Sequence, residues 1–179
     1  MRRSVQLQQY YLSILTTAGI PMYLIGQHKE KQVYYFDLEK DELQNLPKEN
    51  WTAIGIVNGA YKKQLFEGFI KHNVYSGLLE FKGQGIYGET LHDHFDERIV
   101  ELENIEGYPE TDIMTTWYGG EKNDLPNALW DSFNISFATD SIDSARTKVI
   151  CISMDGQNYQ DTIRAILARL NEGWIPPDE

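Results

Sequence analysis

Hydrophobic positions switch repeatedly between extended and helical spacing, which predicts strands and helices interspersed along the chain. Runs rich in branched and aromatic residues predict strands at Met22–Gly26, Val33–Leu38, Thr52–Val57, Val74–Phe81, Asp112–Tyr118 and Lys148–Met154. Apolar residues three and four positions apart predict helices at Ser4–Ala18, Ala60–His72, Glu89–Asn104, Pro126–Phe133 and Tyr159–Leu170. Two hairpins are expected, one with a polar tip at 27–32 and one pairing Ile135–Ala138 with Lys148–Met154.

No internal repeat, low-complexity tract or linker divides the chain, so one globular domain over residues 1–179 is expected. A chain of this length buries roughly 70% of the surface that its unfolded form exposes and needs no disulfide to fold. The predicted fold class is α/β in the broad α+β sense, with a mixed, mostly antiparallel sheet flanked by helices. The strand order stays open at this stage.

The segment Glu89–Asn104 combines apolar and charged positions in a pattern typical of an amphipathic helix. Leu91, Phe95, Ile99 and Leu102 are predicted to face inward. The opposite face would then be strongly acidic.

Charge is concentrated in one region. Between Glu80 and Asp131 the chain has thirteen acidic and three basic side chains, a net charge of −10, and the whole chain carries −11. Such a field repels nucleic acid and attracts basic proteins. We expect these acidic residues to form one contiguous surface.

Cysteine use and hydropathy suggest where the protein acts. The lone Cys151 lies in an apolar run and is predicted to be a buried, inert thiol. The residues after Arg2 and Arg3 are too polar for a signal-peptide core, and no stretch approaches the ~18 apolar residues of a membrane span. A cytoplasmic location without membrane contact is therefore expected.

The segment Gly83–Gly88 spells the Gly-x-Gly-x-x-Gly pattern of dinucleotide-binding loops between a predicted strand and a predicted helix. A pyrophosphate at this place would meet the acidic first turns of that helix, which opposes binding. The alternative interpretation is that these glycines only turn the chain.

His92 and His94, with Asp93 and Asp96, are the residues most suited to hold a zinc or manganese ion. On a strand the two imidazoles would share a face, but on the predicted helix they diverge by about 200°. We therefore expect a solvated acidic helix face and no metal or other cofactor. A small metal-dependent hydrolase that uses this cluster remains the alternative function.

Two tryptophans and a tyrosine flank a loop that enters a short predicted helix at 116–131. Tyr118-Gly119 followed by Asn127-Ala128-Leu129-Trp130-Asp131 resembles the segment with which barstar-type ribonuclease inhibitors enter the helix that plugs a nuclease active site. The resemblance covers sixteen residues and implies that Asp131 meets basic groups of a nuclease. The alternative is that Trp117 and Trp130 are ordinary core residues.

In type, the chain resembles bacterial toxin-immunity proteins, which are small, acidic and poor in catalytic motifs. This implies an inhibitor, or antitoxin, that is not an enzyme and that neutralises a basic protein, for which a nuclease toxin is expected. A nucleic-acid mimic that blocks a DNA-binding defence protein is a related alternative; the oligomeric state stays open. The residues predicted to contact the partner are Asp93, Asp96, Glu97, Glu101, Trp117, Tyr118, Glu121, Asp124 and Asp131.

Overall fold

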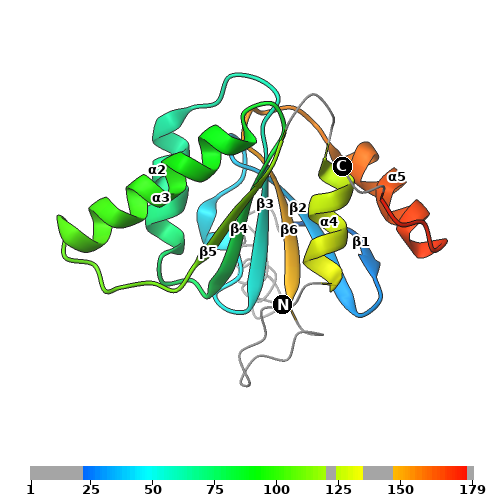
Figure 1. Ribbon diagram of the computed structural model, residues 1–179, viewed down its shortest axis with the longest axis horizontal. Helices are drawn as coiled ribbons and strands as arrows, with labels where there is room; N and C mark the ends of the chain where they lie inside the picture. The colour runs from blue at the N-terminus through cyan, green and yellow to red at the C-terminus, as the bar shows by residue number, and fades with distance from the viewer. Residues whose placement is uncertain (1–21, 120–123, 135–146, 177–179) are drawn as a thin grey trace, which may run out of the picture.

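The computed structural model describes residues 22–119, 124–134 and 147–176, which form a sheet with helices on both faces (Figure 1). The prediction of an α/β sheet flanked by helices is confirmed. The helix expected at Ser4–Ala18 lies outside the described residues. The elements, in chain order, are β1 (Tyr23–His28), β2 (Lys31–Asp37), the 3-10 helix η1 (Leu43–Asn45), β3 (Trp51–Ile56), α2 (Lys63–Asn73), β4 (Leu78–Gln84), α3 (Gly88–Asn104), β5 (Met114–Tyr118), α4 (Leu125–Asn134), β6 (Lys148–Ser153) and α5 (Gln160–Asn171).

The sheet is mostly parallel. Its six strands lie in the order β1-β2-β6-β3-β4-β5, and within the described residues only the β1–β2 pair is antiparallel. The expectation of a mostly antiparallel sheet is therefore wrong. The cause is that α2, α3 and α4 each connect two strands, and a helical crossover returns the chain parallel to its starting direction.

The predicted hairpin between Ile135–Ala138 and Lys148–Met154 is also wrong. β6 has β2 on one side and β3 on the other, both parallel to it, so neither edge of β6 is left for an antiparallel partner. The proposed partner strand, Ile135–Ala138, lies outside the described residues. A continuous apolar run such as that of β6 is typical of a buried parallel strand.

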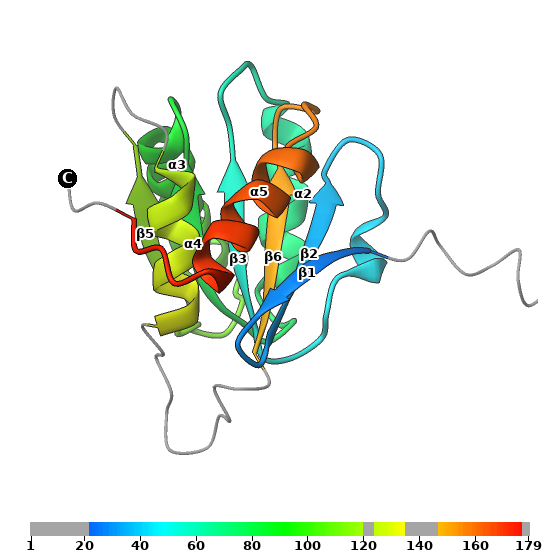
Figure 2. The ribbon, with the colours of Figure 1, turned by 90° about the vertical axis from the view of Figure 1, so that its right-hand side faces the viewer.

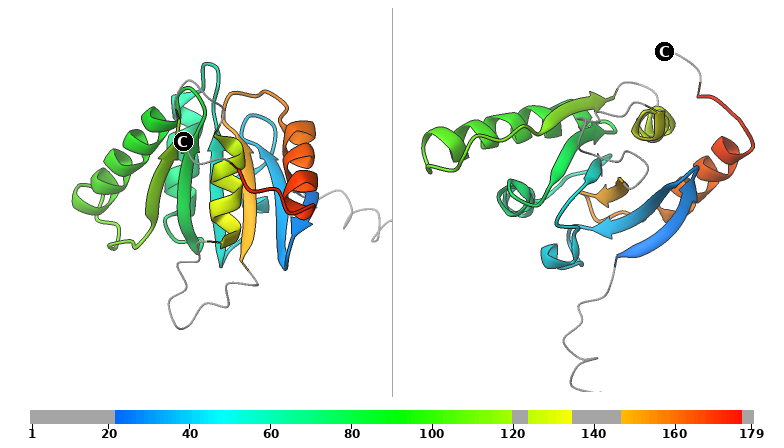
Figure 3. Two further views of the ribbon diagram at one scale, coloured as in Figure 1. Left: turned by 45° about the vertical axis from the view of Figure 1, so that its right-hand side comes forward. Right: turned by 90° about the horizontal axis from the view of Figure 1, so that it is seen from below.

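Helices cover the two faces of the sheet in pairs. α2 and α3 lie on one face and α4 and α5 on the other (Figures 2 and 3). Along β3, Trp51 and Ala53 join the core under α2 and α3, while Ile54 and Ile56 join the core under α4 and α5. This alternation follows the two-residue period of a strand.

The inward face of α3 agrees largely with the prediction. Leu91, Phe95 and Leu102 are buried, and Ile99 is partly buried. In α2, Phe66, Phe69 and Ile70 are buried, whereas Leu65 is exposed.

Glycines allow β4 and α3 to approach closely. A Cβ atom on Gly83 would lie 2.2 Å from the carbonyl oxygen of Gly88, and one on Gly88 would lie 2.9 Å from that of Tyr118. Gly85 has a φ of 104°, and a Cβ there would lie 2.3 Å from the carbonyl oxygen of Val57. Backbone packing and a left-handed turn thus account for these glycines.

This packing makes a prediction about stability. Gly83→Ala should lower the free energy of unfolding by about 1–3 kcal/mol, because the new methyl group overlaps backbone that cannot easily move. Gly68→Ala is the matched control: a Cβ atom on this glycine of α2 would meet nothing within 4 Å, and alanine there should stabilise by about 0.5–1 kcal/mol. Urea denaturation followed by tryptophan fluorescence measures both, and equal effects would contradict the packing argument.

Candidate functional site

The solvent-facing side of α3 carries a stripe of carboxylates, Glu89, Asp93, Glu97 and Glu101, spaced four residues apart. Residues at this spacing lie one above another on a helix. Arg98 donates to Glu101 at 2.9 Å and to Glu106 at 2.6 Å, so it neutralises part of the charge of the stripe and of the neighbouring Glu106. The remaining carboxylates give this face a net negative field.

The acidic face of α3 borders an exposed tryptophan on the edge strand β5. The Thr115 hydroxyl donates to Asp96 Oδ1 at 2.7 Å, and the imidazole of His92 lies 4.7 Å from the ring of Trp117, centroid to centroid. Trp117 is 50% exposed, so it is not a core residue. An aromatic anchor and a carboxylate stripe therefore lie side by side.

On the other side of β5, a pocket opens between this strand, α4 and the segment after α5. Its volume is about 470 Å³. The Tyr118 hydroxyl donates to the Asp131 carboxylate within it. Burial, reinforced by that carboxylate, raises the pKa of Tyr118, which keeps the hydroxyl a donor. The pocket is lined by Trp117, Tyr118, Gly119, Asn127, Trp130, Asp131, Ile175 and Pro176.

Charged side chains lie buried between the sheet and α4. Lys82 Nζ is 2.6 Å from Glu80 Oε1, both side chains are 2% exposed, and the ammonium lies 5.4 Å from the centroid of the Tyr118 ring. Lys31 donates to the carbonyl of Ser132 at 2.9 Å, and burial lowers its pKa. This buried layer was not predicted, although Glu80 and Lys82 alternate with the apolar Phe81, a pattern that places both charged side chains on one face of β4.

The structure brings together most of the predicted partner-binding residues. Asp93, Asp96, Glu97 and Glu101 lie on α3, Trp117 and Tyr118 lie on β5, and Asp131 lies on α4. Asp124 is only 4% exposed, so its side chain does not lie on the surface with the others. Glu121 lies outside the described residues.

The expectation that all the acidic residues of 80–131 share one surface is also corrected. Glu80 and Asp124 are interior residues. The pKa of Glu106 is lowered, first by Lys71 and then by Arg98, both of which donate to it. The exposed charge is therefore concentrated on α3.

His92 and His94 diverge, as predicted from their helical spacing. His92 contacts Trp117 on β5, whereas His94 lies 3.3 Å from the Tyr61 hydroxyl and 3.5 Å from Glu67 of α2. Within the described ranges, no group of three or more His, Cys, Asp or Glu side chains is arranged to hold a metal ion. The two imidazoles therefore face different elements.

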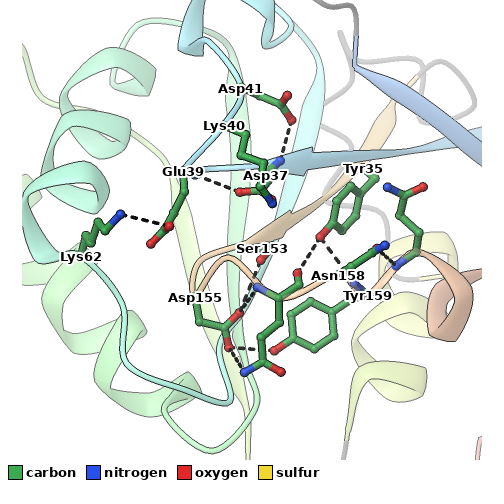
Figure 4. Close-up of polar contacts among 12 residues, drawn as sticks. Tyr35, Asp37, Glu39, Lys40, Asp41, Lys62, Ser153, Asp155, Asn158 and Tyr159 are labelled. Atoms are coloured by element: carbon green, nitrogen blue, oxygen red, sulfur yellow. Dashed lines mark hydrogen bonds and ion pairs between the residues drawn. The ribbon is translucent and has the colours of Figure 1, made fainter.

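A second polar cluster, which no sequence pattern predicted, lies where β3 and β6 end side by side (Figure 4). Here the chain turns from β3 to α2 on one face and from β6 to α5 on the other, which is where open α/β sheets commonly bind ligands. Asp155 Oδ2 accepts hydrogen bonds from the backbone N–H groups of Asn58 at 2.8 Å and Gly59 at 3.0 Å, and from the Tyr159 hydroxyl at 2.8 Å.

In this cluster the Asp155 carboxylate already accepts the backbone N–H groups that could otherwise bind a phosphate. Asp37, the last residue of β2, and Glu39, two residues after it, lie beside this cluster. Each forms an ion pair with a lysine: Asp37 with Lys40 at 2.5 Å and Glu39 with Lys62 at 3.0 Å. These acidic groups oppose binding of an anionic nucleotide. The network instead joins the loops after β2, β3 and β6.

The buried thiol is confirmed: Cys151 is fully buried, and burial raises its pKa to about 12. Among the helices of the described residues, none has both the length and the apolar character needed to cross a bilayer.

A family model described as Domain of unknown function (DUF7684) matches residues 33–170. The chain belongs to this family. The match runs from β2 into α5, so it includes α3, β5 and α4, the elements that build the acidic face and the pocket. Comparisons with curated proteins and with solved structures gave no match.

The buried ion pair between Lys82 and Glu80 lies next to β5 and the pocket, and its contribution to folding stability can be measured. Lys82→Met should cost about 3–5 kcal/mol of folding stability, because it leaves the Glu80 carboxylate buried without its cation. Adding Glu80→Leu should recover at least half of that loss, since an apolar pair of similar volume removes the stranded charge. Urea denaturation of the two single variants and the double variant tests this, and additive losses would contradict it.

Proposed function

We propose that this protein binds a basic protein and neutralises it, and that the partner is a nuclease toxin. The observation that carries the proposal is the carboxylate stripe of α3 lying directly beside the half-exposed Trp117 of β5. Charge and an aromatic anchor are thus available on one continuous surface. The proposal does not require enzymatic activity or a cofactor.

A nuclease suits this surface because its substrate groove must be positive to hold a polyanion. An acidic inhibitor exploits the same charges to steer its approach, which raises the association rate by about 10–10³-fold. Aromatic residues that become fully desolvated then supply most of the binding energy. On this proposal the protein acts in the cytoplasm, where it protects the cell that makes the toxin.

The direct test is co-expression with a basic nuclease encoded beside the gene for this protein. We expect the pair to copurify and purified inhibitor to stop cleavage of a labelled DNA or RNA substrate at a one-to-one ratio. Full cleavage in the presence of excess inhibitor would contradict the proposal.

Charge reversal on α3 tests whether the carboxylates of this helix steer association with the partner, or whether the net negative charge of the whole protein is enough. Asp93→Lys combined with Glu97→Lys should lower the association rate about tenfold or more at low salt and alter dissociation much less. The matched control reverses two exposed acids at the α5 end of the molecule, Asp161→Lys with Glu172→Lys, and has the same net charge. Stopped-flow association at several salt concentrations distinguishes the variants; if both double variants slow equally, α3 is not the docking surface.

A further inference from the structure

The outer side of β5 forms one edge of the sheet (Figure 1), and among the described residues no strand pairs with it. The carbonyl of Tyr118 accepts from the N–H of Gly85, directly after β4, at 3.1 Å, so this carbonyl faces into the sheet. Backbone groups alternate in direction along a strand, and those of Thr115 and Trp117 therefore face outward. Their N–H groups and carbonyls are placed to bind an added strand.

The opposite edge of the sheet is protected by devices that β5 lacks. The register of β1 shifts between Leu24 and Gly26, as at a β-bulge, and the Gln27 carbonyl accepts from Asn171 of α5 at 3.0 Å. Bulges and covered backbone groups prevent strand addition. β5 instead keeps an unbroken register with β4, and its sequence Met-Thr-Thr-Trp-Tyr has no charge, proline or glycine. Threonine, tryptophan and tyrosine favour extended structure.

Carboxylates of α3 line the open edge on one face of the sheet. Asp96 Oδ1 accepts the Thr115 hydroxyl at 2.7 Å. Asp93 lies 3.1 Å from His92, whose ring contacts Trp117. The side chains of Asp96 and Asp93 are 48% and 66% exposed. A strand added at the usual spacing of ~4.7–4.9 Å would run past these two carboxylates, so the side chains that it turns toward α3 meet negative charge.

This charge selects the kind of strand that fits. A second copy of this chain is opposed, because each copy carries a net charge of −11 and antiparallel pairing of two β5 strands would place both α3 helices on the same face. A strand with lysine or arginine at every second position is favoured, since alternate side chains point to one face. In strand addition, main-chain hydrogen bonds supply affinity and alternate side chains supply specificity.

We propose that the outer edge of β5 binds an extended segment of the basic partner as an additional strand of the sheet, with basic side chains at alternate positions facing α3. This rests on the proposed function, because the occupant is a segment of a basic protein. Backbone hydrogen bonds then fix the register of the partner, which charge attraction alone does not fix.

The test titrates the full chain, labelled with ¹⁵N, with two capped peptides of identical lysine and threonine composition. In one peptide the lysines alternate with threonines, and in the other they form a single block. Charge attraction alone treats the two peptides alike, whereas an added strand turns every lysine of the alternating peptide toward α3. The alternating peptide should bind about five- to tenfold more tightly.

Amide hydrogen exchange reports the new backbone bonds. The amides of Thr115 and Trp117 should exchange about tenfold more slowly, or slower still, when the alternating peptide is bound. The Met154 amide is the internal reference, because it already donates to the Ile56 carbonyl at 3.0 Å inside the sheet. Its exchange should not change.

N-methylation separates backbone pairing from side-chain contact. Methylating every second nitrogen of the alternating peptide removes the N–H donors on one side of the strand and retains every charge. Only one side of an added strand pairs with β5. Of the two possible methylated peptides, one should therefore lose binding and the other should bind like the parent.

Variants of the protein place the lysines beside α3. Asp96→Asn retains an oxygen that can accept the Thr115 hydroxyl and removes the charge, so it should weaken the alternating peptide about two- to fivefold. Asp161→Asn is the matched control, because Asp161 is an exposed acid of α5, the helix that packs beside β1. It should leave the affinity unchanged.

Equal affinity of the alternating and block peptides, equal effects of the two methylations, or unchanged exchange of the Thr115 and Trp117 amides at saturation would each overturn strand addition. Protection of these amides without peptide, together with a dimer in sedimentation, would assign the edge to a second copy and would also overturn it. The nuclease-inhibition assay contains no peptide and decides the proposed function separately.

Discussion

The insertion of β6 between β2 and β3 is the constraint on which the rest of the molecule depends. To reach that place from β5 the chain must cross back over the sheet, and α4 makes this crossing on the face opposite α2 and α3. The result is a sheet covered on both faces, as parallel sheets require. It also leaves β5 as an edge strand with α3 on one side and α4 on the other.

That arrangement explains why binding features gather at one edge. The carboxylate stripe of α3 and the pocket wall of α4 come from different crossovers, yet each borders β5, where Trp117 and Tyr118 alternate toward opposite faces. An edge strand has side chains with room for exposure, whereas the central strands do not. The acidic surface and the pocket are thus two faces of one structural element.

Charge is used differently inside and outside the protein. On α3 it faces water and acts over distance, where salt weakens it. Beneath α4, Glu80 and Lys82 neutralise each other in a site from which water is excluded, and at the end of β6 Asp155 satisfies backbone donors of the neighbouring loop. Counting acidic residues cannot separate these uses, because the residue type does not show whether a carboxylate is exposed or buried.

The sequence alone determined what depends on neighbours along the chain. The amphipathic spacing of α3 placed Leu91, Phe95 and Leu102 inward and made His92 and His94 diverge, because helix geometry follows from residues three and four apart. Tertiary structure alone decided the parallel pairing of β6, the burial of Asp124 and the meeting of Tyr118 with Asp131. These depend on which distant segments become neighbours, and the energy that selects them comes from burying whole faces of the sheet, which local patterns do not record.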